Sequence, residues 1–217
     1  VLFRSGAKWW NSIWGDALMI DWSSFVAAMR SAVAGVDAET EKMLQSVLDH
    51  SNTGYVSQYK FSEFLKGFGP FSECARKCRQ ILSEKWFYGF LSSGECQSLL
   101  TTANAPEGTY MMRFSKSKPG SFALAFVNNG QVKDILIESD MPNGYRVPEQ
   151  KSSGQPHLFQ SLTDIISHYP VLTQPFISDL PFQEWFSGDV SRDEAAELLE
   201  GQPEGTFLIR FSRQGCF

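Results

Sequence analysis

The stretch that decides the fold is Glu107-Gly-Thr-Tyr-Met-Met-Arg-Phe-Ser115, which is followed after a turn by the apolar run Phe122–Val127. Within it, Thr109–Phe114 is rich in residues that favour strands, and so is the run that follows the turn. Lys118-Pro-Gly120 lies between the two runs, and this dipeptide of proline and glycine is typical of a tight turn. The sequence therefore predicts two neighbouring antiparallel strands.

The same pattern continues on both sides of these strands. A third strand-like run, Val132–Glu138, follows Asn129-Gly130, which is a strong signal for a hairpin turn. Ser93–Leu100 before the sheet and Leu158–Tyr169 after it carry apolar residues at helical spacing. The order helix, antiparallel sheet, helix predicts an α+β sandwich over residues 84–180.

Residues 8–83 are predicted to form a helical domain. Apolar residues recur at helical spacing in Trp9–Trp14 and again in Phe25–Val33. An internal repeat is also present, because Ile20 and Val56 each follow a turn-rich loop, precede a helix and stand five residues before a phenylalanine. This is the layout of two paired EF-hands, so we expect an EF-hand-like domain.

The second loop of this pair, residues 49–60, resembles a calcium loop only in part. It has Asp49 at position 1, Gly54 at position 6 and apolar Val56 at position 8. Lys60, however, stands at position 12, where a bidentate glutamate is expected, and places a positive charge beside the ion. The first loop has no ligand pattern. We expect a metal-free helical pair that serves as a brace, with a weak calcium site as the alternative.

Composition excludes several classes of function. The net charge of -5 argues against a general nucleic-acid-binding protein, and the apolar runs are too short for a membrane span. The scattered cysteines fit neither a disulfide framework nor a metal knuckle, which indicates a reducing setting. We expect the cytoplasm, with the nucleus as the alternative. His168 has no nucleophile or acid at recognisable spacing, so we expect no catalytic residues and no cofactor. The cysteines are Cys74, Cys78, Cys96 and Cys216.

Taken in order, Trp86-Phe-Tyr-Gly, Glu107–Ser115, Gly120–Phe126 and Ser161–Tyr169 resemble the motifs of a Src homology 2 (SH2) domain. The helical pair that leads into it resembles both the linker plus SH2 unit of STAT transcription factors and the EF-hand plus SH2 unit of the Cbl tyrosine-kinase-binding region. The resemblance implies a non-catalytic adaptor or docking module whose partners are tyrosine-phosphorylated proteins or peptides. The alternatives are a STAT-like or Cbl-like regulatory unit, or the targeting region of a tyrosine kinase or phosphatase.

The resemblance also implies which residues hold the phosphate. Arg113 would bind two phosphate oxygens with its planar guanidinium, because phosphotyrosine carries roughly -1.5 to -2 charges and three acceptor oxygens. Strand alternation places Arg113 and Ser115 on one face, which continues into the loop that would cradle the phosphate. Ser115 and Ser117 would add hydroxyl donors, and Lys116 would add long-range attraction.

The auxiliary positions of the pocket depart from the family pattern. Ser93 stands where many members have a basic residue, while Asp134 and Leu136 stand where histidine and lysine are common. We therefore expect a weaker pocket than a fully basic one, or, as the alternative, a domain that serves only as a scaffold. Ile135 is expected to face the peptide beyond the phosphotyrosine and to set a preference for apolar residues.

Residues 182–217 repeat the opening of the module. Trp185-Phe-Ser-Gly matches Trp86-Phe-Tyr-Gly, and Arg210-Phe-Ser212 stands in the phosphate-binding motif of this second copy. Arg192 occupies the auxiliary position at which the first copy has Ser93. Arg192, Arg210 and Ser212 are thus expected to bind a second phosphotyrosine.

Both ends of the chain suggest a fragment. Residues 1–7 precede the first patterned segment, and we expect them to be a non-native or disordered leader. The chain stops at Phe217, inside the pattern of the second SH2 copy.

Overall fold

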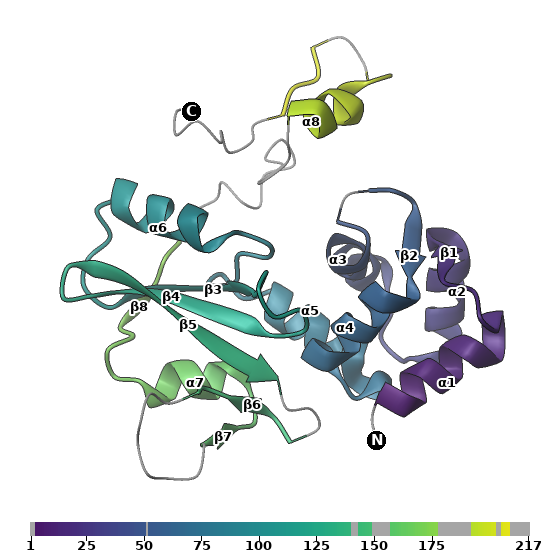
Figure 1. Cartoon of the computed structure of the whole chain (residues 1–217), viewed down its shortest axis with the longest axis horizontal. Helices are drawn as coiled ribbons and strands as arrows, with labels where there is room; N and C mark the ends of the chain where they lie inside the picture. The colour runs from purple at the N-terminus through teal and green to yellow at the C-terminus, as the bar shows by residue number, and fades with distance from the viewer. Residues whose placement is uncertain are drawn as a thin grey trace.

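A helical part and a sheet-containing part follow one another along the chain (Figure 1). The computed structural model describes residues 3–50, 52–139, 143–148, 157–177, 192–202 and 205–208. In the second part, one helix covers each face of a twisted sheet, and the helical part packs against one end of it. This α+β architecture confirms the predicted fold class.

The helical part is built from five α-helices and a small two-stranded sheet. Its elements are α1 (Phe3–Trp14), β1 (Met19–Asp21), α2 (Trp22–Ala32), α3 (Ala38–Leu48), β2 (Tyr55–Ser57), α4 (Gln58–Phe68), the short 3-10 helix η1 (Phe71–Glu73) and α5 (Cys74–Leu82). Asp21, Asp37 and Ser57 cap α2, α3 and α4, since each side chain accepts a hydrogen bond from the N–H three residues on. These caps fix where the helices begin.

The predicted repeat corresponds to a physical pair. Strands β1 and β2 are antiparallel, and Ile20 lies opposite Val56. Below them, the rings of Trp10, Phe25 and Phe61 pack together in the centre of the helical part. The EF-hand-like arrangement of two loops joined by a short ladder is thus present.

Part of the predicted leader is ordered structure. Helix α1 begins at Phe3, inside the segment 1–7. Gly6 is buried, and a Cβ at this position would collide with the Leu65 side chain of α4. The structure thus describes residues 3–7 of the predicted leader as helix, and the absence of a side chain at Gly6 lets α1 approach α4 closely. That residues 1–7 are a non-native or disordered leader stays a prediction.

The sandwich contains α6 (Ser93–Thr102) and α7 (Leu162–His168) on opposite faces of a six-stranded sheet (Figure 1). The strands are β3 (Thr109–Phe114), β4 (Phe122–Asn128), β5 (Gln131–Ser139), β6 (Tyr145–Arg146), β7 (Leu158–Phe159) and β8 (Gln174–Pro175), in the spatial order β7-β6-β5-β4-β3-β8. All neighbours are antiparallel except β3 and β8, which are parallel. The three central strands agree with the predicted runs to within a residue at each end.

Helix α7 is shorter than its apolar pattern predicts. Ser161 is its N-cap, and a capping box with Asp164 stops the helix from extending backwards. Leu158–Phe159, which the periodicity assigned to the helix, instead pairs with β6 as an edge strand. The prediction of a helix over Leu158–Tyr169 was therefore wrong at its start, because it rested on apolar spacing alone and did not include the N-cap at Ser161.

The two parts of the chain share one hydrophobic core. Phe68, at the end of α4, makes edge-to-face contacts with Phe114 and Phe122 of the sheet. Nearby, the Tyr145 hydroxyl donates a hydrogen bond of 3.1 Å to the carbonyl of Gly67. A single cluster of buried side chains accordingly runs from Trp10 in α1 to Ile165 in α7. The other face of the sheet, beneath α6, has its own smaller core.

Of the predicted second copy, the structure describes helix α8 (Arg192–Leu199) and a few residues after it. Arg192 is the first residue of α8 and is exposed. Arg210 and Ser212 lie outside the described residues.

The shared core generates a first prediction. Phe68→Ala removes a fully buried ring from between the two parts and should lower the free energy of unfolding by about 3–5 kcal/mol, as core Phe→Ala changes commonly do. Urea unfolding followed by tryptophan fluorescence and by circular dichroism measures this, and both signals should move together. Leu18→Ala, at a side chain of the helical part that is 74% exposed, should change the stability by less than about 0.5 kcal/mol. Separate transitions of the two parts in the wild-type protein would contradict a shared core.

Candidate functional site

Arg113 is a charged side chain buried in the face of the sheet beneath α6. It is the last residue but one of β3 and is 5% exposed. The side chains of Met111 and Ser115, which share a face of the sheet with Arg113, are also buried. Met111 belongs to the core under α6. A buried charge is costly unless it is paired, so the contacts of Arg113 define the site.

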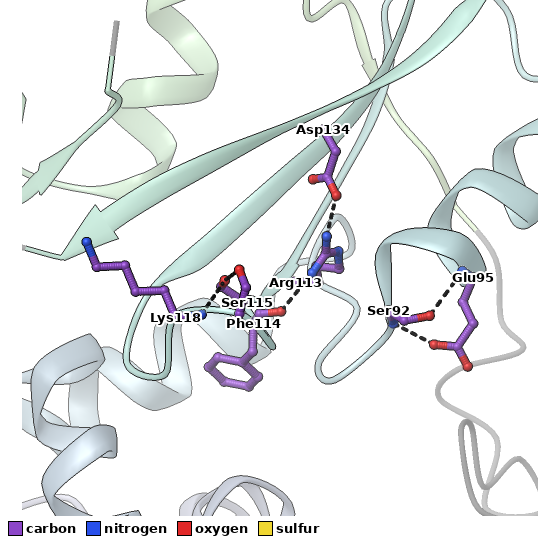
Figure 2. Close-up of polar contacts among 8 residues, drawn as sticks. Ser92, Glu95, Arg113, Phe114, Ser115, Lys118 and Asp134 are labelled. Carbon is purple, nitrogen blue, oxygen red and sulfur yellow. Dashed lines mark hydrogen bonds and ion pairs between the residues drawn. The ribbon is translucent and has the colours of Figure 1, made fainter.

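The guanidinium of Arg113 is only partly satisfied (Figure 2). One Nη forms an ion pair with the carboxylate of Asp134, and the other donates a hydrogen bond of 3.2 Å to the carbonyl of Phe114. The buried Nε has no hydrogen-bond partner among the described residues. Because a guanidinium carries five N–H donors, this side chain retains capacity for further acceptors.

Sheet register explains why Asp134 reaches Arg113. Asp134 of β5 lies opposite Ala125 of β4, and Ala125 lies opposite Met111 of β3. Met111 is two residues before Arg113 and therefore on the same face of the sheet. Leu136 lies opposite Ala123, which is itself opposite Arg113. The small alanine side chains of β4 leave room above this strand, so the carboxylate of Asp134 on β5 can reach across β4 to Arg113 on β3.

The loop after β3 is held in a closed turn by its own polar groups. Ser115 is buried, its hydroxyl shares a hydrogen bond of 3.2 Å with the Ser117 hydroxyl, and it accepts another of 3.2 Å from the backbone N–H of Lys118. The loop also rests on α4, because Gly120 has a positive φ and a Cβ there would lie 2.6 Å from the Cβ of Lys66. The helical part thus supports the loop from behind.

The loop lysines are placed differently. Lys118 forms an ion pair with Glu138 of β5, which also accepts a hydrogen bond of 2.8 Å from Arg146. Hydrogen bonds from Lys118 and Arg146 hold the pKa of Glu138 below its ordinary value. Lys116 is exposed at the outer side of the loop. A positive potential therefore surrounds the loop, although part of it is neutralised by Glu138.

The side chain of α6 that faces Arg113 is Cys96 and not Ser93. Ser93 is exposed in the first turn of α6, behind its N-cap Ser92, and makes no hydrogen bond to Arg113 among the described residues. Cys96, one turn further on, is fully buried. Burial raises the pKa of its thiol to about 12, and the nearby Arg113 charge opposes this rise only in part. Sequence reasoning missed Cys96, although its place three residues after Ser93 was an available signal.

Ile135 is not brought together with Arg113. It lies opposite Leu124 of β4 and packs, half-buried, against the core on the other face of the sheet. Because successive side chains of β5 point to opposite faces of the sheet, Asp134 faces Arg113 and Ile135 faces the side of α7.

The loop 49–60 is held by hydrogen bonds to Asp49. Asp49 is buried, and its carboxylate accepts hydrogen bonds from the backbone N–H groups of Thr53 and Gly54, both 2.8 Å, and from the Thr53 hydroxyl at 2.7 Å. The first ligand position of a calcium loop is therefore engaged by the loop itself. Among the described residues, no group of three acidic, histidine or cysteine side chains is arranged to hold a metal ion. The described helices include none with the length and apolarity that a membrane span requires.

Comparison with known families decides what this architecture is. Residues 86–169 and 185–217 match the SH2 domain family, and together these matches cover more than half of the chain. The chain belongs to the SH2 domain family. Residues 2–82 match the EF hand-like domain of the CBL proto-oncogene N-terminus, which selects the Cbl-like unit from the two that the helical pair resembled. The second SH2 match lies within the predicted second copy, whose bounds stay a prediction.

Relatives contain these domains within larger proteins. The chain is 31% identical over 121 residues to the E3 ubiquitin-protein ligase cblA of Dictyostelium discoideum, and 27% identical over 116 residues to the human SHC-transforming protein 3. The matches cover 55% and 54% of this chain but 18% of each relative. The matched part of the chain thus spans less than a fifth of the length of either protein.

A solved structure has the same fold. It is described as an inactive choanoflagellate E3 ubiquitin ligase Cbl TKB, and it superposes with a TM-score of 0.53 over 79% of this chain and 50% of its own. At 21% sequence identity, this likeness shows the fold alone. It agrees with the order of a helical EF-hand-like part followed by an SH2 sandwich.

The closed loop generates a second prediction. Adding about 1 mM calcium, enough to fill even weak extracellular-type sites, should move the melting temperature by less than about 1 °C. Asp49→Ala should lower the free energy of unfolding by about 1–3 kcal/mol, because two backbone N–H groups and the Thr53 hydroxyl lose their buried acceptor. Thermal unfolding with calcium and with EDTA measures both effects. A calcium-dependent rise in melting temperature that Asp49→Ala abolishes would contradict this description of the loop.

Proposed function

We propose that the first SH2 domain of this chain is a phosphotyrosine-binding docking module anchored by Arg113. The observation that carries this proposal is a nearly buried guanidinium beside the Ser115–Gly120 loop, with an Nε that has no partner among the described residues. Such a group suits an incoming anion with several acceptor oxygens. Phosphotyrosine, with roughly -1.5 to -2 charges and three phosphate oxygens, has this chemistry.

The loop supplies the remaining donors. The hydroxyls of Ser115 and Ser117 share one hydrogen bond, and the Ser115 oxygen otherwise accepts from the Lys118 N–H, so a hydroxyl proton can rotate to donate to a phosphate oxygen. Lys116 adds attraction that salt screens, because it is exposed. Neutral hydroxyls and one guanidinium thus replace the fully basic pocket of other members.

Asp134 sets the strength of binding. Its carboxylate occupies one side of Arg113 in the free protein, so the phosphate has to share the guanidinium with it or displace it. Two anions on one cation repel each other, and this repulsion lowers affinity without removing the site. We infer that the pocket is selective for a dianionic phosphate and discriminates against weaker acceptors such as carboxylates.

A docking role without catalysis fits the rest of the chain. Both matched families are binding modules, and His168 packs on the rings of His157 and Phe159 at the end of α7. The partners would be tyrosine-phosphorylated proteins in the cytoplasm, and the net charge of -5 disfavours nucleic acid.

A second candidate is favoured by the helical part. Its match to the Cbl EF hand-like domain suggests that the chain selects phosphorylated substrates for a ubiquitin ligase. A RING finger in the complete gene would support this role, and a kinase or phosphatase domain there would overturn it.

Substitutions at the ion pair test the proposed function. Arg113→Ala should weaken binding to a degenerate phosphotyrosine peptide library by about 100-fold or more, since the main charged donor is lost. Asp134→Asn should tighten binding by about tenfold while it lowers the free energy of unfolding, because the buried arginine loses its partner charge. Isothermal titration and urea unfolding measure the two opposite effects.

Two comparisons make the result decisive. Asp16→Asn, the same change at an exposed site of the helical part, should alter neither quantity. Arg113→Lys keeps the positive charge but lacks the planar guanidinium that binds two oxygens, so its affinity for the phosphotyrosine peptides should fall about tenfold or more. Unchanged affinity of folded Arg113→Ala would reject the proposal.

A further inference from the structure

A cleft of about 260 Å³ lies between the helical part and the loop that follows β3. Its floor is aromatic, with the half-buried rings of Phe90 and Phe114 at the surface and the buried rings of Phe64, Phe68 and Phe122 beneath them. Figure 2 shows the Phe114 ring pointing away from Arg113, which places this floor on the opposite side of β3 from the guanidinium. The cleft is thus separate from the phosphate site.

The size of the cleft selects its occupant. Pockets that bury drug-sized ligands commonly have roughly 300–1,000 Å³, so a cleft of about 260 Å³ is suited to one large side chain rather than to a whole small molecule. An aromatic or branched aliphatic side chain would gain the most, because the floor consists of rings.

The cleft and the phosphate site share a wall. Ser115 and Gly120 both line the cleft, and the Ser115 hydroxyl at the same time closes the phosphate loop. A peptide anchored at Arg113 therefore needs to pass only around this loop to reach the cleft. An extended chain advances roughly 3.3 Å per residue, so a few residues next to the phosphotyrosine suffice.

The rim of the cleft is positive. Lys60 and Lys116 both line it, and Lys60 makes no ion pair with the described residues. The acidic residue of the rim, Glu63, is already paired with Lys66. A ligand segment with an acidic residue is therefore complementary to this rim. Lys60 stands at position 12 of the loop 49–60, where a calcium-binding loop has glutamate. The same substitution places a positive charge at the cleft.

We propose that this cleft is a second subsite for the phosphotyrosine ligand and takes one large apolar side chain that has an acidic neighbour. The subsite rests on the proposed function of Arg113, because the phosphate anchors the peptide that enters it. Two domains then read one ligand: the sandwich reads the phosphate, and the helical part reads the flanking residues.

The experiment compares a small probe with a long one. Phenyl phosphate occupies only the Arg113 pocket, whereas a phosphotyrosine peptide library with random residues on both sides of the tyrosine reaches the cleft. With wild-type protein, library sequencing should show an apolar residue and an acidic residue enriched at fixed positions in the bound fraction. The best enriched peptide is then titrated against variants, in EDTA to exclude an effect of calcium on Lys60→Glu.

Val47→Phe fills the cleft from α3 and should weaken the selected peptide by about tenfold while phenyl phosphate binds within twofold of wild type. Lys60→Glu should remove the preference for an acidic residue. Lys42→Glu, the same charge change on the exposed side of α3, is the matched control and should leave the enrichment unchanged.

The outcomes separate the two proposals. Failure of phenyl phosphate to bind wild-type protein, or its indifference to Arg113→Ala, would reject the proposed function. Normal phenyl phosphate binding, together with library enrichment that is identical in wild type, Val47→Phe and Lys60→Glu, would overturn the subsite alone. If Val47→Phe does not fold, Lys60→Glu by itself decides.

Discussion

The structure depends on the packing of Phe68 against Phe114 and Phe122. Through these edge-to-face contacts the last turn of α4 becomes part of the core of the SH2 sheet, and one buried cluster spans both parts of the chain. The same turn supports the loop after β3 at one point, since a Cβ at Gly120 would lie 2.6 Å from the Cβ of Lys66. The position of the loop, and with it the geometry around Arg113, is therefore set by residues of two domains.

The buried charge of Arg113 is compensated within the protein itself. A guanidinium this deeply buried needs an anion even when no ligand is present, and Asp134 provides it from the neighbouring strand. This ion pair compensates the buried charge, and under the proposed function a phosphate would have to compete with Asp134 for the guanidinium. Cys96 packs beside the guanidinium and interacts with its charge, but burial dominates and keeps the thiol protonated. Under the proposed function, the pocket would exchange the Asp134 carboxylate for a phosphate rather than offer an open cation.

Sequence alone predicted what depends on local pattern. The bounds of β3, the pairing of Ile20 with Val56 and the face of Arg113 all follow from periodicity and repeats. Contacts across elements could not be predicted in this way: the meeting of Cys96 and Arg113 depends on how α6 crosses the sheet, and the partners of Phe68 depend on how the two parts dock. The start of α7 was missed because a side-chain cap competes with apolar spacing and wins.

The tight seat of Gly120 against Lys66 has a consequence for how this module can be inherited. SH2 domains are commonly regarded as portable units that can be moved between proteins with their function intact. Here, excising the sandwich would expose the rings of Phe114 and Phe122 and remove the surface on which the phosphate loop rests. Gene rearrangement would have to carry residues 3–177 as one exchangeable piece, so the heritable unit of this chain is larger than the SH2 fold itself.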